Sequence, residues 1–224
     1  MKLATILRPA CGVLLLLACT VGAVNAAETS TPVMLVATDR LAGSGYAETV
    51  LFAAPLRNGA HIGFIMNRPT RLQLSDLFPE HVPSRRVKEP VYFGGPVLAE
   101  MLFTVTRGVP EGAGETLALM PGLILVVDGP TVDRVIETMP NDARYFAGLV
   151  IWQPGELAEE LRAGAWEVLP ADAKAVFDTN PGGMWKGLHA APGMKRAAYV
   201  VKVGDQVEAT YIEAAVISVE PAPK

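Results

Sequence analysis

The segment from 49 to 66 constrains the fold more than any other part of this sequence. Two apolar runs, 49–54 and 60–66, are separated by the turn residues Arg57-Asn58-Gly59. Because Asn-Gly tolerates the positive backbone angles of a tight turn, the two runs are predicted to pair as an antiparallel hairpin. Short links of this kind favour a mixed or mainly antiparallel sheet over a doubly wound parallel one.

Short apolar runs separated by turn signals continue along the chain, so we expect an α+β (mixed α/β) fold. No internal repeat is visible. Further strands are expected at 33–37, 90–93, 101–106, 117–120, 123–127, 145–152 and 166–169. A terminal strand pair is expected at about 198–216, with one strand at 198–203 and the other at 207–216. Helices are expected at 72–78, 131–139, 154–164, 170–177 and 185–190.

Residues 1–26 have the pattern of a secretory signal. Lys2 and Arg8 form a basic start, the segment 10–23 is almost wholly apolar, and Val24-Asn25-Ala26 offers the small residues that a signal peptidase reads. We therefore expect a periplasmic or secreted protein. The predicted organisation is a signal at 1–26, a flexible tether at 27–32, a single domain at 33–221 with a divergent C-terminal strand pair, and a loose end at 222–224.

Both cysteines, Cys11 and Cys19, lie inside the predicted signal. Cleavage after Ala26 would leave no cysteine for a disulfide, a nucleophile or a metal site. Leu16-Leu17-Ala18-Cys19 also resembles a lipoprotein cleavage box with Cys19 as the acylated residue. Contact with the membrane is thus expected only through the signal or through a lipid on Cys19.

The charge balance argues against nucleic acid as a partner. The whole chain has a net charge of −4, and removal of residues 1–26 takes two basic residues and no acidic one. Affinity for nucleic acid comes chiefly from neutralising phosphates with basic side chains. The basic cluster Arg85-Arg86-Val87-Lys88 is flanked by prolines and is interpreted as a solvated loop.

Two strand ends are predicted to build one concave site. The apolar run at 60–66 ends in Asn67-Arg68-Pro69, and the run at 90–93 ends in Gly94-Gly95-Pro96-Val97. The Asn67 amide could bind a ligand or bond the local backbone, and Arg68 could hold an anion or lie in solvent. Gly94 and Gly95 could form an anion-binding nest or simply a tight corner. We take Asn67, Arg68, Gly94, Gly95 and Pro96 as the candidate ligand-binding residues.

The remaining polar residues give no reason to expect catalysis, a metal or a cofactor. The three histidines are scattered without the spacing of a zinc site, and Ser44 lacks the surroundings of a nucleophile. The three tryptophans are interpreted as packing residues, and Glu156 and Glu160 as a solvated helix face. Asp39, Asp76 and Asp128 could in principle converge as acid and base, but each sits where turns and helix starts ordinarily place Asp. The other side chains considered are His61, His81, His189, Ser44, Trp152, Trp166 and Trp185.

With these residues in view, the chain resembles the YqgE/AlgH family over roughly 34–190. Leu35-Val36-Ala37 is similar to the family's opening strand, 63–69 to its Gly-(apolar)-Asn-Arg/Lys-Pro segment, and 93–97 to its Gly-Gly-Pro-Val turn. Trp152-Gln153-Pro154-Gly155-Glu156-Leu157 is similar to its Trp-x-x-Gly-Gln-Leu helix start. The resemblance implies a compact single domain in which a strongly curved, barrel-like sheet is flanked by helices.

The chain also departs from the family pattern at polar positions. Gly43-Ser44 replaces a common Asp-Pro, Glu156 replaces a Gln, and Leu56 and Thr106 stand where relatives often carry histidines. The fold should carry over, whereas an activity that used those polar groups need not.

These observations leave three functions. The leading one is a non-catalytic exported module that binds an unknown small molecule or an envelope protein. The first alternative is a hydrolase or transferase that uses carboxylates. The second is the transcriptional regulation that the family label suggests, which the signal and the acidic balance disfavour.

Overall fold

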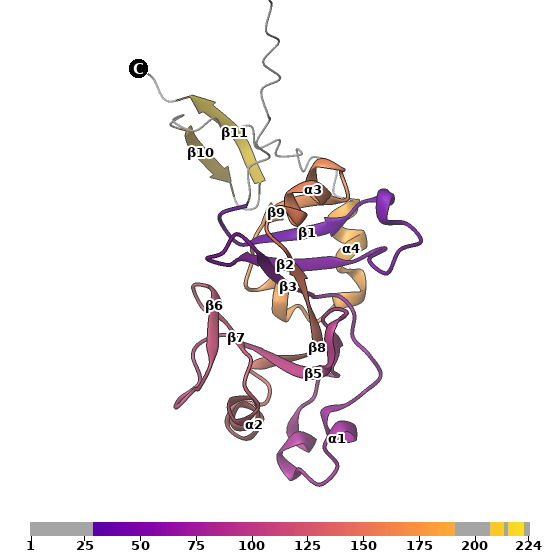
Figure 1. Ribbon diagram of the computed structural model, residues 1–224, viewed down its shortest axis with the longest axis vertical. Helices are drawn as coiled ribbons and strands as arrows, with labels where there is room; N and C mark the ends of the chain where they lie inside the picture. Colours follow the sequence, from indigo (N-terminus) through magenta and orange to yellow (C-terminus); the bar gives the residue numbers. More distant parts are fainter. Residues whose placement is uncertain (1–28, 191–206, 213–214, 222–224) are drawn as a thin grey trace, which may run out of the picture.

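The computed structural model describes residues 29–190, 207–212 and 215–221. One mainly antiparallel nine-stranded sheet curls into a half-barrel in the order β6-β7-β5-β8-β3-β2-β1-β9, with β4 paired to β8 (Figure 1). This confirms the predicted curved, mixed α/β fold. The strands are β1 (Val33–Ala37), β2 (Val50–Pro55), β3 (His61–Ile65), β4 (Tyr92–Phe93), β5 (Val97–Thr106), β6 (Thr116–Met120), β7 (Leu123–Val126), β8 (Ala143–Trp152) and β9 (Trp166–Pro170).

The predicted hairpin around Asn58-Gly59 is confirmed. Strands β2 and β3 pair antiparallel from Leu51↔Ile65 to Pro55↔His61. Gly59 has a φ of 80°, in the left-handed region that this turn requires. The one parallel pairing in the described sheet, β4 with β8, was not predicted, because β4 is only two residues long.

The described part of the chain contains four α-helices that flank the sheet, and short 3₁₀ turns connect several elements. The segment 170–177 was predicted as a helix, which is wrong: Pro170 ends β9, and the Asp172 carboxylate accepts from Lys174 N, leaving only a 3₁₀ turn. The elements are α1 (Leu74–Leu77), α2 (Gly129–Thr138), α3 (Glu156–Arg162), α4 (Pro181–His189), η1 (Asp39–Leu41), η2 (Val82–Arg86) and η3 (Ala175–Phe177).

Near the C-terminus, β10 (Val207–Ile212) and β11 (Ala215–Pro221) form a separate antiparallel pair. The stretch 207–216, predicted as one strand, is therefore divided between two strands. The predicted strand at 198–203, the signal with Cys19, and the loose end lie outside the described residues. None of the helices in the described part has the length and apolarity needed to cross a membrane.

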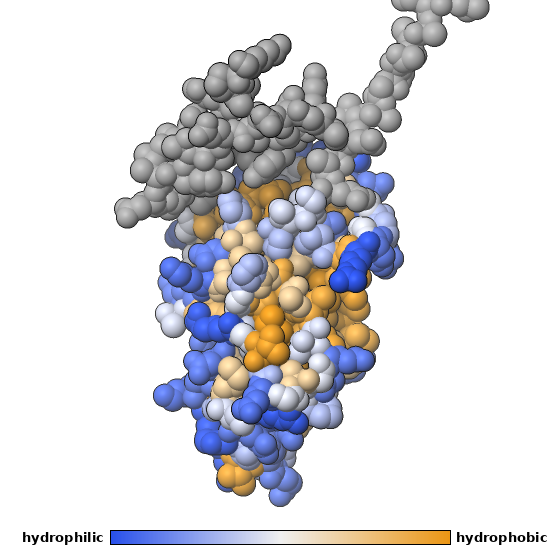
Figure 2. Space-filling model, turned by 90° about the vertical axis from the view of Figure 1, so that its left-hand side faces the viewer, coloured by the Kyte–Doolittle hydropathy of each residue, from blue (hydrophilic) through white to orange (hydrophobic). Residues whose placement is uncertain are grey.

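Both faces of the sheet are buried at β1, β2 and β7, and these three strands are apolar throughout. In β1, Met34 and Val36 point into the concave core, while Val33 and Leu35 point into a second core under α3. A third core lies between α2 and the β5–β7 end of the sheet. On the side that carries edge strand β6, apolar surface gathers in the middle and is bordered by hydrophilic surface (Figure 2).

Strand β8 joins the two halves of the sheet and bends at Gly148. Residues 143–147, before the bend, pair with β5, and two of them also pair with β4; after it, Leu149 still pairs with Val97 of β5, and residues 150–152 pair with β3. Gly148 has a φ of 72°, and a Cβ there would lie 2.2 Å from the Gly95 carbonyl oxygen. Only glycine therefore fits both the backbone angle and the space.

Replacing Gly148 should reveal this double constraint. Gly155 also has a positive φ, 84°, but a Cβ there meets nothing within 4 Å. We expect Gly155→Ala to lower the free energy of unfolding by about 1 kcal/mol, through backbone strain alone. Gly148→Ala should lower it by about 3 kcal/mol, because the clash adds to the strain. Urea denaturation measures both, and equal losses would contradict the close approach.

The carboxylate of Glu160 holds two tryptophans under α3. Its Oε2 accepts hydrogen bonds from the indole Nε1 of Trp152 at 2.9 Å and of Trp166 at 2.7 Å. The interpretation of Glu160 as part of a solvated face is therefore wrong, whereas the packing role of these two tryptophans is confirmed. Glu156 instead accepts from Gln153 N at the start of the helix.

Removing the Glu160 carboxylate leaves two indole donors without a partner. We expect Glu160→Ala to lower the free energy of unfolding by about 3 kcal/mol. Glu159→Ala, on the same helix but exposed, should change it by less than about 0.5 kcal/mol. Thermal and urea unfolding measure the difference, and a similar loss in both variants would show that the loss of a carboxylate near the start of α3, and not the shared acceptor, is responsible.

Candidate functional site

The two predicted corners do lie side by side. The amide of Phe93 donates to the Arg68 carbonyl at 2.9 Å, and the amide of Ile65 donates to the Gly94 carbonyl at 2.8 Å. The end of β3 and the end of β4 are thus joined by backbone hydrogen bonds. The sequence pattern correctly placed both corners at one point of the fold.

The Asn67 side chain bonds the backbone at the start of β2 and just before it. Its Oδ1 accepts from Val50 N at 2.8 Å, and its Nδ2 donates to the Glu48 carbonyl at 2.9 Å. Glu48 has a φ of 57°, a conformation that non-glycine residues rarely adopt. The amide of Asn67 therefore stabilises a strained turn.

Arg68 binds the same loop from the other side. Its guanidinium donates to the carbonyls of Gly45 and Ala47. The loop that contains Gly43-Ser44 is thus tied to the end of β3 through a side chain that we had considered for anion binding or for solvent.

Gly94 and Gly95 lie against the bend of β8. A Cβ at Gly94 would lie 2.2 Å from the Gly148 carbonyl oxygen, and one at Gly95 would lie 2.2 Å from that of Leu149. The Gly94 amide already donates to Ala147, and Pro96, which follows, is exposed. These contacts account for the corner structurally, and its binding of a ligand stays a prediction.

An isosteric substitution tests the structural role of Asn67. In Asn67→Asp an oxygen replaces Nδ2 and faces the Glu48 carbonyl, so we expect the free energy of unfolding to fall by about 1–3 kcal/mol. Asn58→Asp is the matched control, because Asn58 is exposed and uses only Oδ1, to accept from Ala60 N. If Asn67→Asp unfolds like the wild type in a denaturant titration, the amide is free for another purpose.

A groove with a volume of about 540 Å³ lies at the opposite end of the molecule from α3. It is bounded by α2, β5 and the segment after α1. Phe78 and Met101 are 41% and 42% exposed there, although both are large and apolar. The lining residues are Phe78, His81, Met101, Leu102, Val127, Gly129, Pro130, Val132, Asp133 and Ile136.

The wall formed by α2 is fixed by its N-terminal cap. The Asp128 carboxylate accepts from the amide and the hydroxyl of Thr131, both at 3.0 Å. These hydrogen bonds hold the pKa of Asp128 below its usual value. Asp128 is therefore a capping residue, as its position before an apolar helix indicates.

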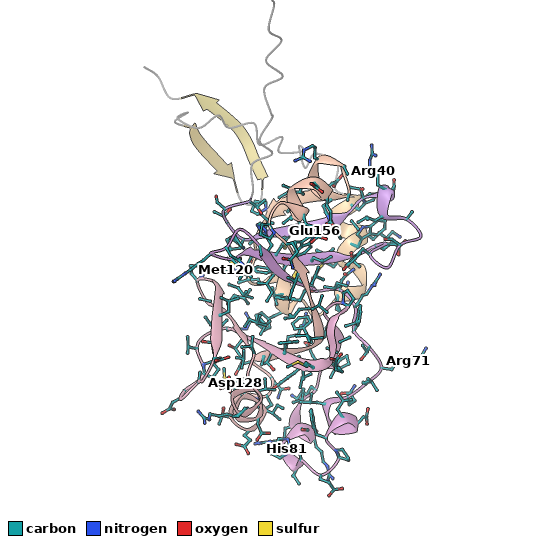
Figure 3. The ribbon with its side chains drawn as sticks, viewed as in Figure 1. Arg40, Arg71, His81, Met120, Asp128 and Glu156 are labelled. Atoms are coloured by element: carbon teal, nitrogen blue, oxygen red, sulfur yellow. The ribbon has the colours of Figure 1, made fainter. Side chains whose placement is uncertain are left out.

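The other histidine and carboxylate candidates are dispersed. Asp39 and His189 contact each other at 3.7 Å, at the end of the molecule that carries Arg40, whereas His81 lies at the end formed by α1 and α2 (Figure 3). His61 is buried and contacts Thr29, and Asp76 accepts from Gln73 N at the start of α1. A second, smaller hollow is lined by Thr38, Asp39, Ala42, Gly43, Ala47, Glu48 and Trp185.

Arg144 was not predicted as a functional or structural residue, and it is 1% exposed. Its guanidinium donates to the Glu89 carboxylate at 2.7 and 2.9 Å and to the carbonyls of Val176 and Asp178. It also stacks over Tyr92, whose pKa is raised to about 12 chiefly by burial. Because Arg144 lies in β8 and donates to both of these carbonyls, it ties the 175–178 segment to the sheet.

Comparison with known proteins identifies the family. A model of the AlgH-like family matches residues 34–197. The chain belongs to the AlgH-like family. It is 31% identical over 157 residues to a UPF0301 protein of Chlorobaculum parvum, and 29% identical over the same length to one of Chlorobium phaeobacteroides; each match covers 68% of this chain and 81% of the relative.

Two solved structures share the fold. The solution structure of the AlgH protein of Pseudomonas aeruginosa gives a TM-score of 0.60 at 23% identity, covering 78% of this chain and 94% of that one. A crystal structure of a Corynebacterium diphtheriae protein gives 0.58 at 24%, covering 72% and 86%. Similarity at this level supports the architecture alone.

Proposed function

We propose that this AlgH-like protein is an exported, non-catalytic binding module. Its ligand is a small molecule with an apolar body and one polar end, held in the groove between α2, β5 and the segment after α1. The export pattern of residues 1–26 supports action in the periplasm or outside the cell. The net charge of −4 argues against DNA as the target.

The composition of the groove carries this proposal. Its volume of about 540 Å³ lies within the range of small-molecule sites, roughly 300–1,000 Å³. Most lining side chains are apolar, and the two that ionise, His81 and Asp133, contact each other at 3.3 Å. Such a groove would bind an apolar body along its length and a polar group beside His81.

In this proposal the corners at Asn67 and Gly94 do not bind the ligand but stabilise the sheet that carries the groove. Their hydrogen bonds hold the β3 and β4 ends against β8, and β8 pairs in turn with the groove strand β5. The polar atoms of Asn67 and Arg68 are bonded to the backbone, whereas the groove offers open apolar surface.

Filling the groove tests the proposal. A Cβ at Gly129 meets nothing within 4 Å, so Gly129→Leu should place its side chain in the groove without disturbing α2. Using 8-anilinonaphthalene-1-sulfonate, which has an apolar body and an anionic end, we expect fluorescence titration of the full chain to show at least about fivefold weaker binding, since burying a Leu-sized volume removes about 1 kcal/mol or more of contact.

Gly182→Leu is the matched control. Gly182 is also exposed, near the start of a helix and free of neighbours, but lies in α4, away from the groove. It should leave probe binding unchanged, and both variants should melt like the wild type. Equal binding by the wild type and Gly129→Leu would overturn the groove as the site. A small molecule that co-purifies with the wild type but not with Gly129→Leu would identify the ligand.

A further inference from the structure

His81, Asp133 and Glu137 bring three metal-ligating side chains together at the rim of the groove. One donor atom from each lies within 4.8 Å of the other two. His81 precedes η2, whereas the two carboxylates are four residues apart on one face of α2. The scattered histidines had argued against a metal in the sequence, but only one of them is needed here.

The His81 imidazole is oriented as a metal ligand would be. Its Nδ1 is hydrogen-bonded at 2.8 Å to Ser84 Oγ, and Ser84 is 1% exposed. Its Nε2 is buried and has no hydrogen-bond partner in the described structure. A bond at one ring nitrogen typically fixes the ring so that the other can coordinate a metal.

The distance between His81 Nε2 and Asp133 Oδ1, 3.3 Å, suits a shared ion. Zinc bonds to nitrogen and oxygen are about 2.0–2.2 Å, so neighbouring ligands of a tetrahedral site lie roughly 3.3–3.5 Å apart. Glu137 is exposed, and its carboxylate can close the remaining distance by rotating its side chain.

The charges on α2 also favour a cation. Asp133 and Glu137 are like charges at i and i+4, an arrangement that destabilises a helix. Among the described residues, no Lys or Arg side chain lies within ion-pair distance of either carboxylate. A divalent ion would offset this repulsion, and with neutral His81 the site would carry no net charge.

The two elements that supply the ligands are already joined without a metal. Arg86 donates to the Glu137 carbonyl at 2.8 Å, and the Asn141 side chain accepts from Lys88 N and donates to the Arg86 carbonyl. The segment from His81 to Lys88 is thus held against the end of α2. This pre-organisation lowers the cost of bringing the ligands together.

From this geometry we propose that His81, Asp133 and Glu137 bind a divalent transition-metal ion of the zinc type. One imidazole and two carboxylates supply three protein ligands, and the fourth position of a tetrahedral ion stays open. Since His81 and Asp133 also line the groove, the open position would face a ligand bound there. The metal site does not depend on what occupies the groove.

Zinc competition with a chromophoric chelator, on the metal-stripped full chain, tests the site. We expect one Zn²⁺ per chain and an affinity that falls at least about tenfold in His81→Ala, in Glu137→Gln and, through lost orientation of the ring, in Ser84→Ala. His189→Ala is the control, because His189 contacts a single carboxylate, Asp39, at 3.7 Å. It should bind zinc like the wild type.

Two results would overturn the proposal: no stoichiometric zinc binding by the wild type, or an equal loss in His189→Ala and His81→Ala. Glu137→Gln changes an exposed side chain, so its fold should persist even if His81→Ala proves unstable, and circular dichroism checks both. Gly129→Leu should retain zinc while losing the apolar probe. The two sites can therefore fail independently.

Discussion

The structure depends on the bend of β8 at Gly148. Strand β8 pairs with β5 on both sides of the bend, with β4 only before it, and with β3 from residue 150 onward, so a single strand belongs to both halves of the sheet. The facing strand β5 shows a register shift between Val97 and Leu102, opposite the bend. Carbonyl oxygens of the Gly95 corner fill the space that a side chain at 148 would need. Curvature of the half-barrel thus follows from close backbone packing, which glycine alone permits.

Much of this fold could be predicted from the sequence because its signals are local. Asn58-Gly59 sets the β2–β3 turn, and the apolar runs locate the central strands of a sheet that is buried on both faces. The helix at 170–177 was wrongly predicted because its apolar spacing suits a helix. In the structure Pro170 ends β9, and a turn at Asp172 follows. The parallel β4–β8 pair could not be foreseen, because two residues carry no periodicity.

In the candidate site too, local features could be predicted from the sequence, whereas contacts between distant segments could not. The corners at Asn67 and Gly94 have a recognisable pattern because the fold needs them, and their polar groups are spent on backbone partners. Glu160 and Arg144 bind partners that the sequence pattern did not indicate, so their roles were not predictable. The groove arises where side chains from α2, β5 and the segment after α1 meet, and no single stretch of sequence encodes it.

A polar side chain whose hydrogen bonds are made to the protein stabilises the fold, whereas a buried polar atom without a partner can still bind a ligand. Asn67, Arg68, Glu160 and Arg144 belong to the first kind. His81 Nε2 belongs to the second, since its ring is held by Ser84 and the unpartnered nitrogen faces a carboxylate. Among the sites considered, chemistry beyond folding is therefore best sought at the α2 end of the molecule. The exposed apolar surface of the groove and the unpartnered His81 Nε2 lie together there.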